Sequence, residues 1–509
     1  MPIRASDLLK EGFRMKKRFL SALSLILVFA VVFGSFTFAS AEETAEQDDS
    51  APFRIHVTVN GDAKSERGFC WYTKTETDSL VEIEGVEPAN ITYDDVFEWE
   101  GNFCHKAKVT GLEPGAEYTY TVGSRDSRSE EGRFVTDDGD ESFSFIAIAD
   151  VQASSAENFE KGANTLKAAV KTLPDAEFIV NAGDFTNDST NEEWDLYADS
   201  FDPINLQYTL APVAGNHDGF GCEYWFKNMF NLDMSESVQI KDGVNYSFDY
   251  GNAHIAVLNT NDLFSVTIPQ LKWLKNDMNS TDKDWKIVAM HKSPYTLGKD
   301  GKWPDAMYLQ LSLTKVVDEC GVDLVISGHD HQYLRTKPLK GNKLDENGAT
   351  YVLLGTAGSK RYEVRKFLSD SFMNTKFINT LIIQKGGYGN YWNGEDFDST
   401  KEENIGGCFN TISIDGGTLT FNSYILSDEL TDESGERLIT NTDTFTLEKE
   451  TGKNEITFTG DNTTSEFDYA IGLIPSVAAL AGYAFGIWLP KFLFIVPRIL
   501  ESVIVDDTF

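Results

Sequence analysis

Five short apolar segments, each followed at once by an Asp, Asn or His, constrain the fold of this chain more than any other feature. The segments are β-prone and short enough to be buried strands. Ligands of open α/β sheets bind at the carboxyl ends of the strands. The sequence therefore predicts an α/β domain with a site at those ends. The segments and their following residues are 143–148 with Asp150 and Gln152, 178–180 with Asp184, 208–213 with Asn216, His217 and Asp218, 287–290 with His291, and 322–326 with His329 and His331.

The last of these segments ends in Gly328-His329-Asp330-His331. Side chains two positions apart on an extended chain point to opposite sides, so the two imidazoles suit two neighbouring metal ions. Gly328 lets the backbone turn tightly after a buried strand. Taken alone, the motif is equally compatible with two surface histidines in a loop. The other four segments, in their order, favour the metal site.

The ordered set, which spans residues 150 to 331, resembles the calcineurin-like metallophosphoesterases and, within them, the purple acid phosphatases. The resemblance implies a layered α/β/β/α domain with mixed sheets, two metal ions, and hydrolysis of a phosphate ester by a hydroxide between the metals. Asp184 matches the bridging ligand, Asp150 and His331 match the first metal, and the other ligands match the second. The implied metal ligands are Asp150, Asp184, Asn216, His291, His329 and His331.

His217 follows the ligand Asn216, so its side chain is expected to point away from that metal. The resemblance places it against the substrate phosphate. It would there stabilise the transition state or deliver a proton to the leaving group. Asp218 is expected to orient this imidazole through its other ring nitrogen. A plain turn-capping role for Asp218 is the alternative.

Two positions depart from the family pattern. Purple acid phosphatases have Tyr three residues after the bridging Asp, where this chain has Asn187. Without a phenolate the protein should not be purple, and the case for Fe³⁺ weakens. Other metallophosphoesterases have His two residues after the first Asp, where this chain has Gln152. Gln152 could give a weak oxygen ligand, bond a metal-bound water, or do neither, and Fe, Mn and Zn all stay open.

Residues 52–138 show short alternating segments separated by turns, which predicts an all-β sandwich. The Leu-x-Pro-Gly-x-x-Tyr-x-Tyr pattern at 112–120 resembles fibronectin type III modules, as found in front of purple acid phosphatase catalytic domains. His56 and His105 in this region, and His254 further on, lie on predicted strands. We expect all three to be structural.

The catalytic domain is expected over residues 142–449. The stretch 361–407 matches no pattern and is either a loop over the site or a surface excursion. The predicted helices cover 158–172, 268–278 and 306–320, and the predicted later strands cover 351–355, 411–421 and 445–449.

Two apolar runs concern membranes. The basic cluster before Phe19, the run from Phe19 to Phe38 and the small residues that follow predict a secretory signal over residues 1–41, with an uncleaved anchor as the rival. Near the other end, 469–490 predicts a transmembrane segment, with a buried helix as the rival. These features predict a secreted or cell-surface protein, anchored with its catalytic domain outside. The remaining parts are an acidic lead-in at 42–51, a linker at 450–468 and a tail at 491–509.

The charge balance excludes some partners. With 44 basic and 80 acidic side chains, the formal net charge is −36. This argues against a general nucleic-acid binder, and it means that attraction for a phosphate ester must be local. Five cysteines make no disulfide framework, although Cys70 and Cys104 could either pair or stay free buried thiols.

The sequence thus predicts a dinuclear metal hydrolase of phosphomonoesters. A phosphodiesterase or nucleotide pyrophosphatase on the same scaffold is the alternative within enzymes. A surface adhesion protein with an inactive phosphatase-like domain is the alternative outside them. No residue of the expected ligand set is missing, which favours an enzyme.

Overall fold

The computed structural model describes residues 48–218, 223–238, 244–261, 263–296, 304–360, 362, 405–450 and 456–459, with three two-residue strands between 382 and 398. The predicted signal segment at 1–41, the transmembrane segment at 469–490 and most of the stretch 361–407 lie outside these residues. Within the described part, no helix combines the length and apolar character needed to cross a bilayer.

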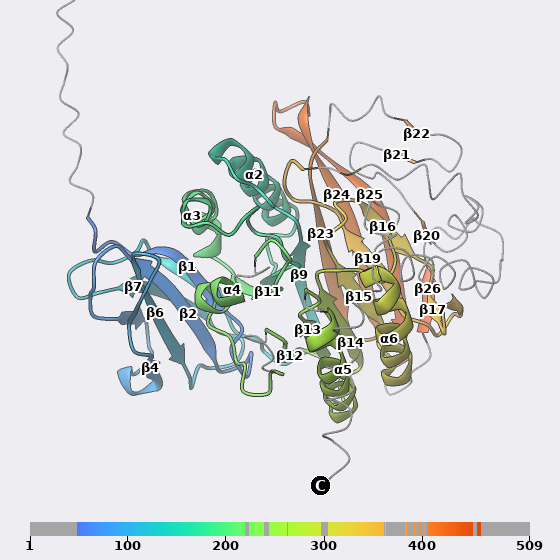
Figure 1. Ribbon diagram of the computed structural model, residues 1–509, viewed down its shortest axis with the longest axis horizontal. Helices are drawn as coiled ribbons and strands as arrows, with labels where there is room; N and C mark the ends of the chain where they lie inside the picture. Colours follow the sequence, from blue (N-terminus) through green and yellow to red (C-terminus); the bar gives the residue numbers. More distant parts are fainter. Residues whose placement is uncertain are drawn as a thin grey trace, which may run out of the picture. The chain divides into compact units, whose positions relative to one another are not determined.

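One large mixed sheet runs through the molecule (Figure 1). Its central strands β9, β10 and β11 are parallel, and β23 pairs antiparallel with the other side of β9. The strand order is β26 (Ile456–Thr459), β25 (Arg437–Lys449), β24 (Thr418–Thr431), β23 (Ile405–Asp415), β9 (Ser142–Ile148), β10 (Phe178–Asn181), β11 (Thr209–Pro212), β1 (Phe53–Thr58), β2 (Arg67–Thr73), β6 (Asn102–Val109) and β4 (Ile91–Tyr93), with β5 (Phe97–Trp99) also paired to β6.

The N-terminal region is a β-sandwich, as predicted. Strands β1, β2, β6, β4 and β5 form one layer, and a three-stranded sheet forms the other. Phe69, Trp71, Tyr120 and Phe134 fill the space between the layers. The sequence did not reveal that β1 also pairs with β11 of the catalytic part, through Thr58 and Leu210. The second layer consists of β3 (Leu80–Ile83), β7 (Glu117–Gly123) and β8 (Gly132–Val135).

A second mixed sheet faces the catalytic part of the first. Strands β13, β14, β15 and β19 are parallel, while β12 and β16 are antiparallel to their neighbours. The order is β12 (Tyr246–Tyr250), β13 (Ala253–Leu258), β14 (Trp285–Met290), β15 (Leu324–Ser327), β19 (Thr350–Leu354), β16 (Tyr333–Thr336) and β20 (Ile382–Ile383). Two small hairpins pair β17 (Leu339–Lys340) with β18 (Lys343–Leu344) and β21 (Tyr391–Trp392) with β22 (Phe397–Asp398).

Aromatic side chains join the two sheets face to face. Phe178 of β10 stacks on Phe145 of β9, with ring centroids 4.7 Å apart, and meets Tyr250 of β12 at 4.8 Å. These rings are buried. Because apolar area leaves water on both sheets at once, the packing fixes the two sheets against each other.

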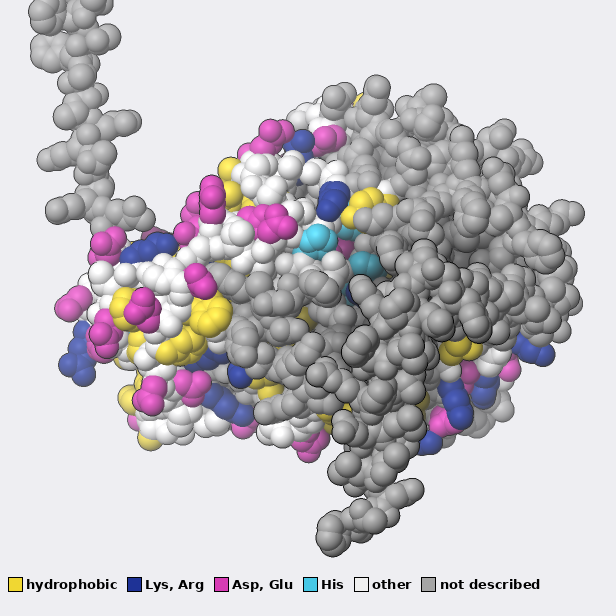
Figure 2. All heavy atoms as spheres, viewed as in Figure 1, with side chains coloured by type: hydrophobic (Ala, Val, Ile, Leu, Met, Phe, Trp, Pro, Cys, Tyr) yellow, Lys and Arg dark blue, Asp and Glu magenta, His cyan; other side chains and the backbone are white. Residues whose placement is uncertain are grey.

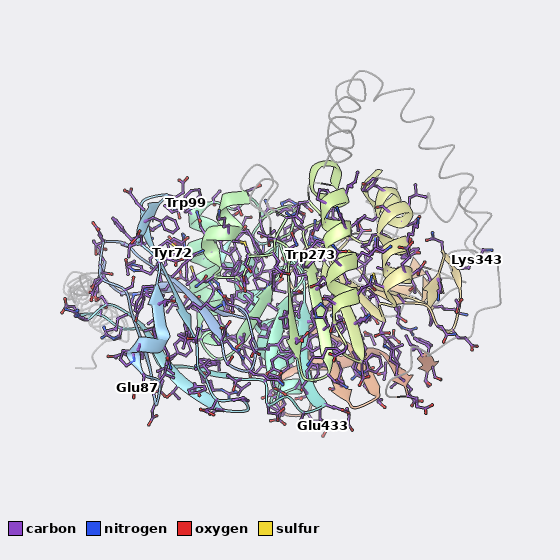
Figure 3. The ribbon with its side chains drawn as sticks, turned by 90° about the horizontal axis from the view of Figure 1, so that it is seen from below. Tyr72, Glu87, Trp99, Trp273, Lys343 and Glu433 are labelled. Carbon is purple, nitrogen blue, oxygen red and sulfur yellow. The ribbon has the colours of Figure 1, made fainter. Side chains whose placement is uncertain are left out.

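Helices cover the outer faces, which gives the predicted α/β/β/α layers (Figures 1 and 3). On the second sheet, Leu274 of α5 and Leu313 of α6 pack into an apolar cluster with Val288 of β14, and Trp273 lies on α5. The helices are α2 (Ala156–Thr172), α3 (Asn191–Asn205), α4 (Glu223–Met229), α5 (Leu263–Ser280) and α6 (Pro304–Cys320), with a 3-10 turn at Pro88–Asn90.

Helix α3, which the sequence did not suggest, begins at a capping box. The side chain of Thr190 accepts a hydrogen bond from the Glu193 backbone N–H, and the Glu193 side chain accepts one from the Thr190 backbone. This reciprocal arrangement satisfies two backbone donors at the start of the helix. Cys70 and Cys104 are both free thiols, with their sulfur atoms 3.9 Å apart, so the disulfide alternative is not realised.

Candidate metal centre

The registers of the parallel strands bring the predicted residues to one place. Ile148 of β9 pairs with Asn181 of β10, and Asn181 pairs with Pro212 of β11. In the second sheet, Met290 of β14 pairs with Ser327 of β15. The strands of each sheet therefore end level with one another. The loops that follow carry all the predicted ligands.

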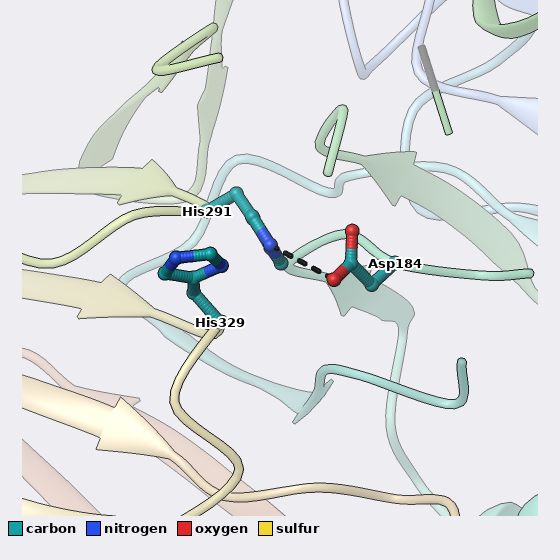
Figure 4. Close-up of side chains that lie close together, drawn as sticks. All are labelled: Asp184, His291 and His329. Atoms are coloured by element: carbon teal, nitrogen blue, oxygen red, sulfur yellow. Dashed lines mark ion pairs between the residues drawn. The ribbon is translucent and has the colours of Figure 1, made fainter. Parts of the chain in front are cut away.

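Two groups of ligand atoms lie at these strand ends. The first consists of Asp150, Asp184 and His331, and the second of Asp184, His291 and His329. Within each group the ligand atoms lie within 4.8 Å of one another. Figure 4 shows Asp184, His291 and His329 converging from different strand ends. Asp184 belongs to both groups, as expected of a carboxylate that bridges two cations.

Asn216 extends the second group. Its Oδ1 lies 3.2 Å from Nε2 of His291, and the same nitrogen lies 3.2 Å from Oδ2 of Asp184. An amide oxygen, an imidazole nitrogen and a carboxylate oxygen thus face a common point. The six predicted ligands are brought together by the fold.

Backbone carbonyls set the orientation of two imidazoles. Nδ1 of His291 lies 2.8 Å from the Ala182 carbonyl oxygen, and Nδ1 of His331 lies 2.5 Å from the Lys360 carbonyl oxygen. In each case Nδ1–H donates a hydrogen bond to the carbonyl oxygen, so Nε2 is the ring nitrogen that faces the centre. His331 also stacks on Tyr362, with centroids 4.2 Å apart. Contacts of this kind fix metal ligands before any metal arrives.

The loops are strained where the site is built. Asp150, Asp184, Gln152, His329 and His331 all have positive φ, at 55°, 57°, 36°, 80° and 50°. Non-glycine residues rarely adopt this region, and such strain clusters at functional sites. Strand-end loops that aim a carboxylate or an imidazole back over the sheet require these backbone angles.

Two glycines leave room for the carboxylates. A Cβ at Gly215 would lie 2.1 Å from Oδ1 of Asp184. A Cβ at Gly328 would lie 2.7 Å from Oδ2 of Asp150. The backbone at both positions passes directly against a ligand side chain, which explains why each motif contains a glycine.

The buried carboxyl groups and imidazoles shift one another's pKa values. Burial alone would lower the pKa of His291, but the carboxylate of Asp184 raises it to about 9. Burial alone would likewise raise the pKa of Asp184, but the neighbouring imidazoles, His291 foremost, hold it below its usual value. Burial raises the pKa of Asp150 well above its usual value. A site that gathers two buried carboxylates and three imidazoles has the donor set and charge that suit divalent cations.

Asp218 does not take the role predicted for it. Its carboxylate accepts hydrogen bonds from the backbone N–H groups of Asp184, Gly215, Phe185 and Thr186, at 2.7, 2.9, 2.8 and 3.4 Å. Nδ1 of His217 instead contacts the carbonyl oxygen of Asn187. The expectation that Asp218 orients the ring of His217 is therefore wrong. Asp218 holds the backbone of the ligand loops, because four donors saturate its two oxygens.

The two departures from the family pattern have different environments. Gln152 is buried, and neither its amide oxygen nor its amide nitrogen has a hydrogen-bond partner among the described residues. Asn187 is engaged: its Nδ2 donates to Asp188, and its Oδ1 accepts from Nζ of Lys360. Sequence reasoning missed Lys360 and the Asn187 carbonyl, because backbone contacts between distant loops leave no local signal.

Two parts of the chain match known protein families. Residues 143–333 match the calcineurin-like phosphoesterase family, and residues 52–136 match the purple acid phosphatase N-terminal domain. The chain therefore carries a calcineurin-like phosphoesterase domain behind a purple acid phosphatase N-terminal domain. This confirms the predicted resemblance to the calcineurin-like metallophosphoesterases in the part of the chain that the two family models match.

Several similar curated proteins are named as purple acid phosphatases. Purple acid phosphatase 18 of Arabidopsis thaliana is 22% identical over 345 residues, which cover 64% of this chain and 76% of the relative. Purple acid phosphatase 15 of the same plant is 20% identical, over 53% of this chain and 56% of the relative. A third relative, 26% identical over 50% of this chain and 49% of its own length, is named a probable inactive purple acid phosphatase. The chain thus spans about half to three quarters of these relatives.

Solved structures agree on the fold. A purple acid phosphatase from yellow lupin (Lupinus luteus) seeds superposes with a TM-score of 0.58 and 18% identity, covering 78% of this chain and 74% of that one. PhoD superposes with a TM-score of 0.54 and 11% identity, covering 82% and 93%. At these identities the likeness concerns architecture alone.

Proposed function

We propose that this protein hydrolyses phosphomonoesters at a dinuclear metal centre held by the six ligands described above. The observation that carries the proposal is the membership of Asp184 in both ligand groups. Two cations, when bound, neutralise phosphate oxygens and acidify a water between them, which serves as the nucleophile. The residues present fit that requirement in donor type, burial and spacing.

The protein's own side chains divide the remaining work. Asp184 would be shared by the two cation sites, Asp150 and His331 would complete the first, and Asn216, His291 and His329 would complete the second. His217 lies beside this centre, with its Nδ1 held by the Asn187 carbonyl. Its Nε2 can then stabilise the phosphate in the transition state or give a proton to the leaving oxygen.

Gln152 is a further candidate ligand. A buried amide without a protein partner costs free energy unless something else satisfies it. We propose that its oxygen would be a further ligand for the first cation, at the position where other metallophosphoesterases have His. Iron, manganese and zinc all accept this mixture of carboxylate, imidazole and amide donors.

We further propose that the chain is exported and anchored at the cell surface. The apolar run before Ala39-Ser40-Ala41 and the apolar segment at 469–490 support this. Protease treatment of intact cells tests it. An anchored ectodomain is digested, whereas a chain inside the cell is protected.

The function is tested on the purified full-length protein by metal analysis and a phosphoester panel. We expect two metal ions per chain and turnover of p-nitrophenyl phosphate. A chelator should abolish this turnover, and adding back one particular kind of metal ion should restore it. Faster turnover of bis(p-nitrophenyl) phosphate would favour the phosphodiesterase alternative. A metal-free protein that is indifferent to chelator would favour the adhesion alternative.

A further inference from the structure

The segment that follows β13 lies beside the metal centre, although none of its residues was predicted to belong to the site. The last residues of β13 and of the parallel strand β14 pair with each other. The segment 259–261 therefore leaves the second sheet next to His291. The backbone N–H of Lys292, the residue after His291, donates to the Thr260 hydroxyl at 2.8 Å. The segment thus holds the loop of one proposed ligand of the second cation.

Asn261 joins this segment to the first sheet. Its Nδ2 donates hydrogen bonds to the carbonyl oxygens of Ala214 and Gly215, at 3.1 and 2.9 Å. Both carbonyl groups lie in the loop after β11, directly before Asn216. Only the NH₂ end of an amide can donate to two carbonyl oxygens, so these contacts define which way the side chain points. Because Asn216 and His291 follow strands of different sheets, Asn261 connects two ligand loops that the sheets alone do not join.

The segment that carries Asn261 is itself firmly held. The backbone N–H of Asn261 donates to Oδ1 of Asn259 at 3.1 Å. The backbone N–H of Asn259 donates to Oε1 of Gln270 on α5, and the Asn259 carbonyl accepts from Nε2 of the same side chain, both at 2.7 Å. Asn259 and Gln270 are buried. Satisfied hydrogen bonds of this kind make a buried polar network rigid, so the Asn261 amide has a fixed support.

The contacts of Asn261 concern one of the two proposed cation sites. Asn216 and His291 belong to the second site, and Oδ1 of Asn216 lies 3.2 Å from Nε2 of His291. Asp150 and His331 belong to the first site, and the hydrogen bonds that hold them come from residues elsewhere in the chain. A change at Asn261 should therefore weaken the second site and spare the first.

We propose that Asn261 is a positioning residue for the second cation site and acts through the backbone before Asn216. The inference rests on the proposed function. Asp218 holds the loop after β11 to its neighbour within the first sheet, and Asn261 adds the link to the second sheet. Without that link, the loop can move away from His291, and the second cation loses part of its ligand set. Asn261 itself touches neither the cation nor the substrate.

The test is a calorimetric titration of the metal-free, full-length protein with zinc ions, together with metal analysis. Figure 2 shows histidine side chains exposed at a hollow of the surface, so zinc can reach the centre from solvent. We expect the wild type to bind two zinc ions. Asn261→Ala should bind the first normally and the second about 10–100-fold more weakly, as when other residues that orient metal ligands are removed. Asn261→Asp has nearly the same volume and should lose at least as much, because a carboxylate cannot donate to a carbonyl oxygen.

Asn231→Ala is the matched control. Asn231 is also a half-buried asparagine, and its Nδ2 donates to the carbonyl oxygens of Ala107 and Phe69 in the N-terminal sandwich, at 2.8 and 3.4 Å. This variant should lower the unfolding midpoint about as much as Asn261→Ala does, because each removes two hydrogen bonds of the same kind. It should keep the affinity for both zinc ions.

Double variants identify the site that is affected. Asn261→Ala should add little to the loss of zinc in His291→Ala, but it should remove the remaining zinc from His331→Ala, because only residues that serve one site are coupled. Equal weakening of both zinc ions, or two normal affinities with only a lower unfolding midpoint, would overturn the inference. A wild-type protein that binds two zinc ions but hydrolyses no ester with any metal would instead overturn the proposed function, and the titration would still decide the role of Asn261. Fewer than two zinc ions in the wild type would overturn both.

Discussion

The backbone N–H of Asp184 donates a hydrogen bond to Oδ2 of Asp218 at 2.7 Å. The same carboxylate accepts from the backbone of Gly215 at 2.9 Å and of Phe185 at 2.8 Å. Asp218 therefore ties the loop after β10, which carries the bridging ligand, to the loop after β11, which carries Asn216. An acidic residue that looks catalytic in sequence is thus a clamp between two ligand loops.

Replacement of Asp218 by Asn tests this clamp. One side-chain oxygen becomes an NH₂ group that faces backbone donors, so two N–H groups lose their acceptor. Each buried donor left unpaired costs about 1–3 kcal/mol. We expect Asp218→Asn to lower both the unfolding midpoint and the metal content. Full metal content with a selective loss of rate would instead return Asp218 to the predicted role of orienting His217.

His217 should behave differently. Its ring lies outside the two ligand groups, so His217→Ala should retain both metals while losing roughly 10²–10⁴-fold in kcat. If His217 delivers a proton, the variant should lose more hydrolysis rate on esters with poor leaving groups than on p-nitrophenyl phosphate. Rates measured across leaving groups, with metal analysis alongside, check this. Loss of metal in the variant would make His217 a ligand.

Asp184→Ala removes the carboxylate shared by both ligand groups. We expect loss of most bound metal and nearly all hydrolysis, because neither cation keeps its bridging partner. Asp175→Ala is the control, since this exposed carboxylate precedes the same strand β10 at its other end. Retention of more than about a tenth of wild-type activity, a change of only ~1.4 kcal/mol, would contradict the assignment.

The ligand set was predictable because each ligand can be identified from the residues next to it in the sequence. Each ligand follows a short apolar strand directly, and parallel strands bring their carboxyl ends together whatever the loops between them do. The same argument placed the helices correctly at 158–172, 268–278 and 306–320, within a few residues of α2, α5 and α6. An apolar stripe at helical spacing is likewise a local signal.

The features that the sequence did not predict depend on contacts between segments far apart in the chain. In the sequence, Asp218 looks like a residue that orients His217. In the structure it accepts a hydrogen bond from the backbone N–H of Asp184, which is 34 residues away. Lys360 has no motif, and its partners Asn187 and His331 lie 173 and 29 residues away in the chain. The pairing of β1 with β11 joins the sandwich to the catalytic sheet, and nothing in the sequence of either strand indicates this partner.

Colour gives a simple check of Asn187. Its side chain bonds Asp188 and Lys360 and offers no phenolate to a metal. We expect the iron-loaded protein to lack the visible charge-transfer band of ferric tyrosinate. An absorption spectrum before and after removal of iron is sufficient. A band that disappears with the iron would mean that another tyrosine reaches the centre.

His254 lies apart from the metal centre, on β13, and is held between two carboxylates. Its Nδ1 is 2.7 Å from Asp249 and its Nε2 is 2.8 Å from Asp277. Burial alone would lower the pKa of His254, but hydrogen bonds to both carboxylates raise it to about 9. The sequence prediction of a structural histidine is consistent with this position.

The raised pKa of His254 has a defined consequence for stability. The native state holds a proton that the unfolded state releases near its usual pKa of 6.5, so the ion pairs contribute fully below pH 6.5. Their contribution is lost as pH rises through about 9. Since Asp249 is half-exposed, solvent screening reduces the effect, and we expect roughly 1–2 kcal/mol.

His254→Gln should remove this dependence, because glutamine can bond one carboxylate but carries no charge. Urea unfolding of wild type and variant at about pH 7 and about pH 9.5 should show the variant weaker at the lower pH and nearly equal at the higher. His105→Gln is the control: burial lowers the pKa of His105 to about 4, so it is neutral at both values. A difference between wild type and His254→Gln that is the same at both pH values would show that His254 stabilises the fold by packing and neutral hydrogen bonds, without its charge.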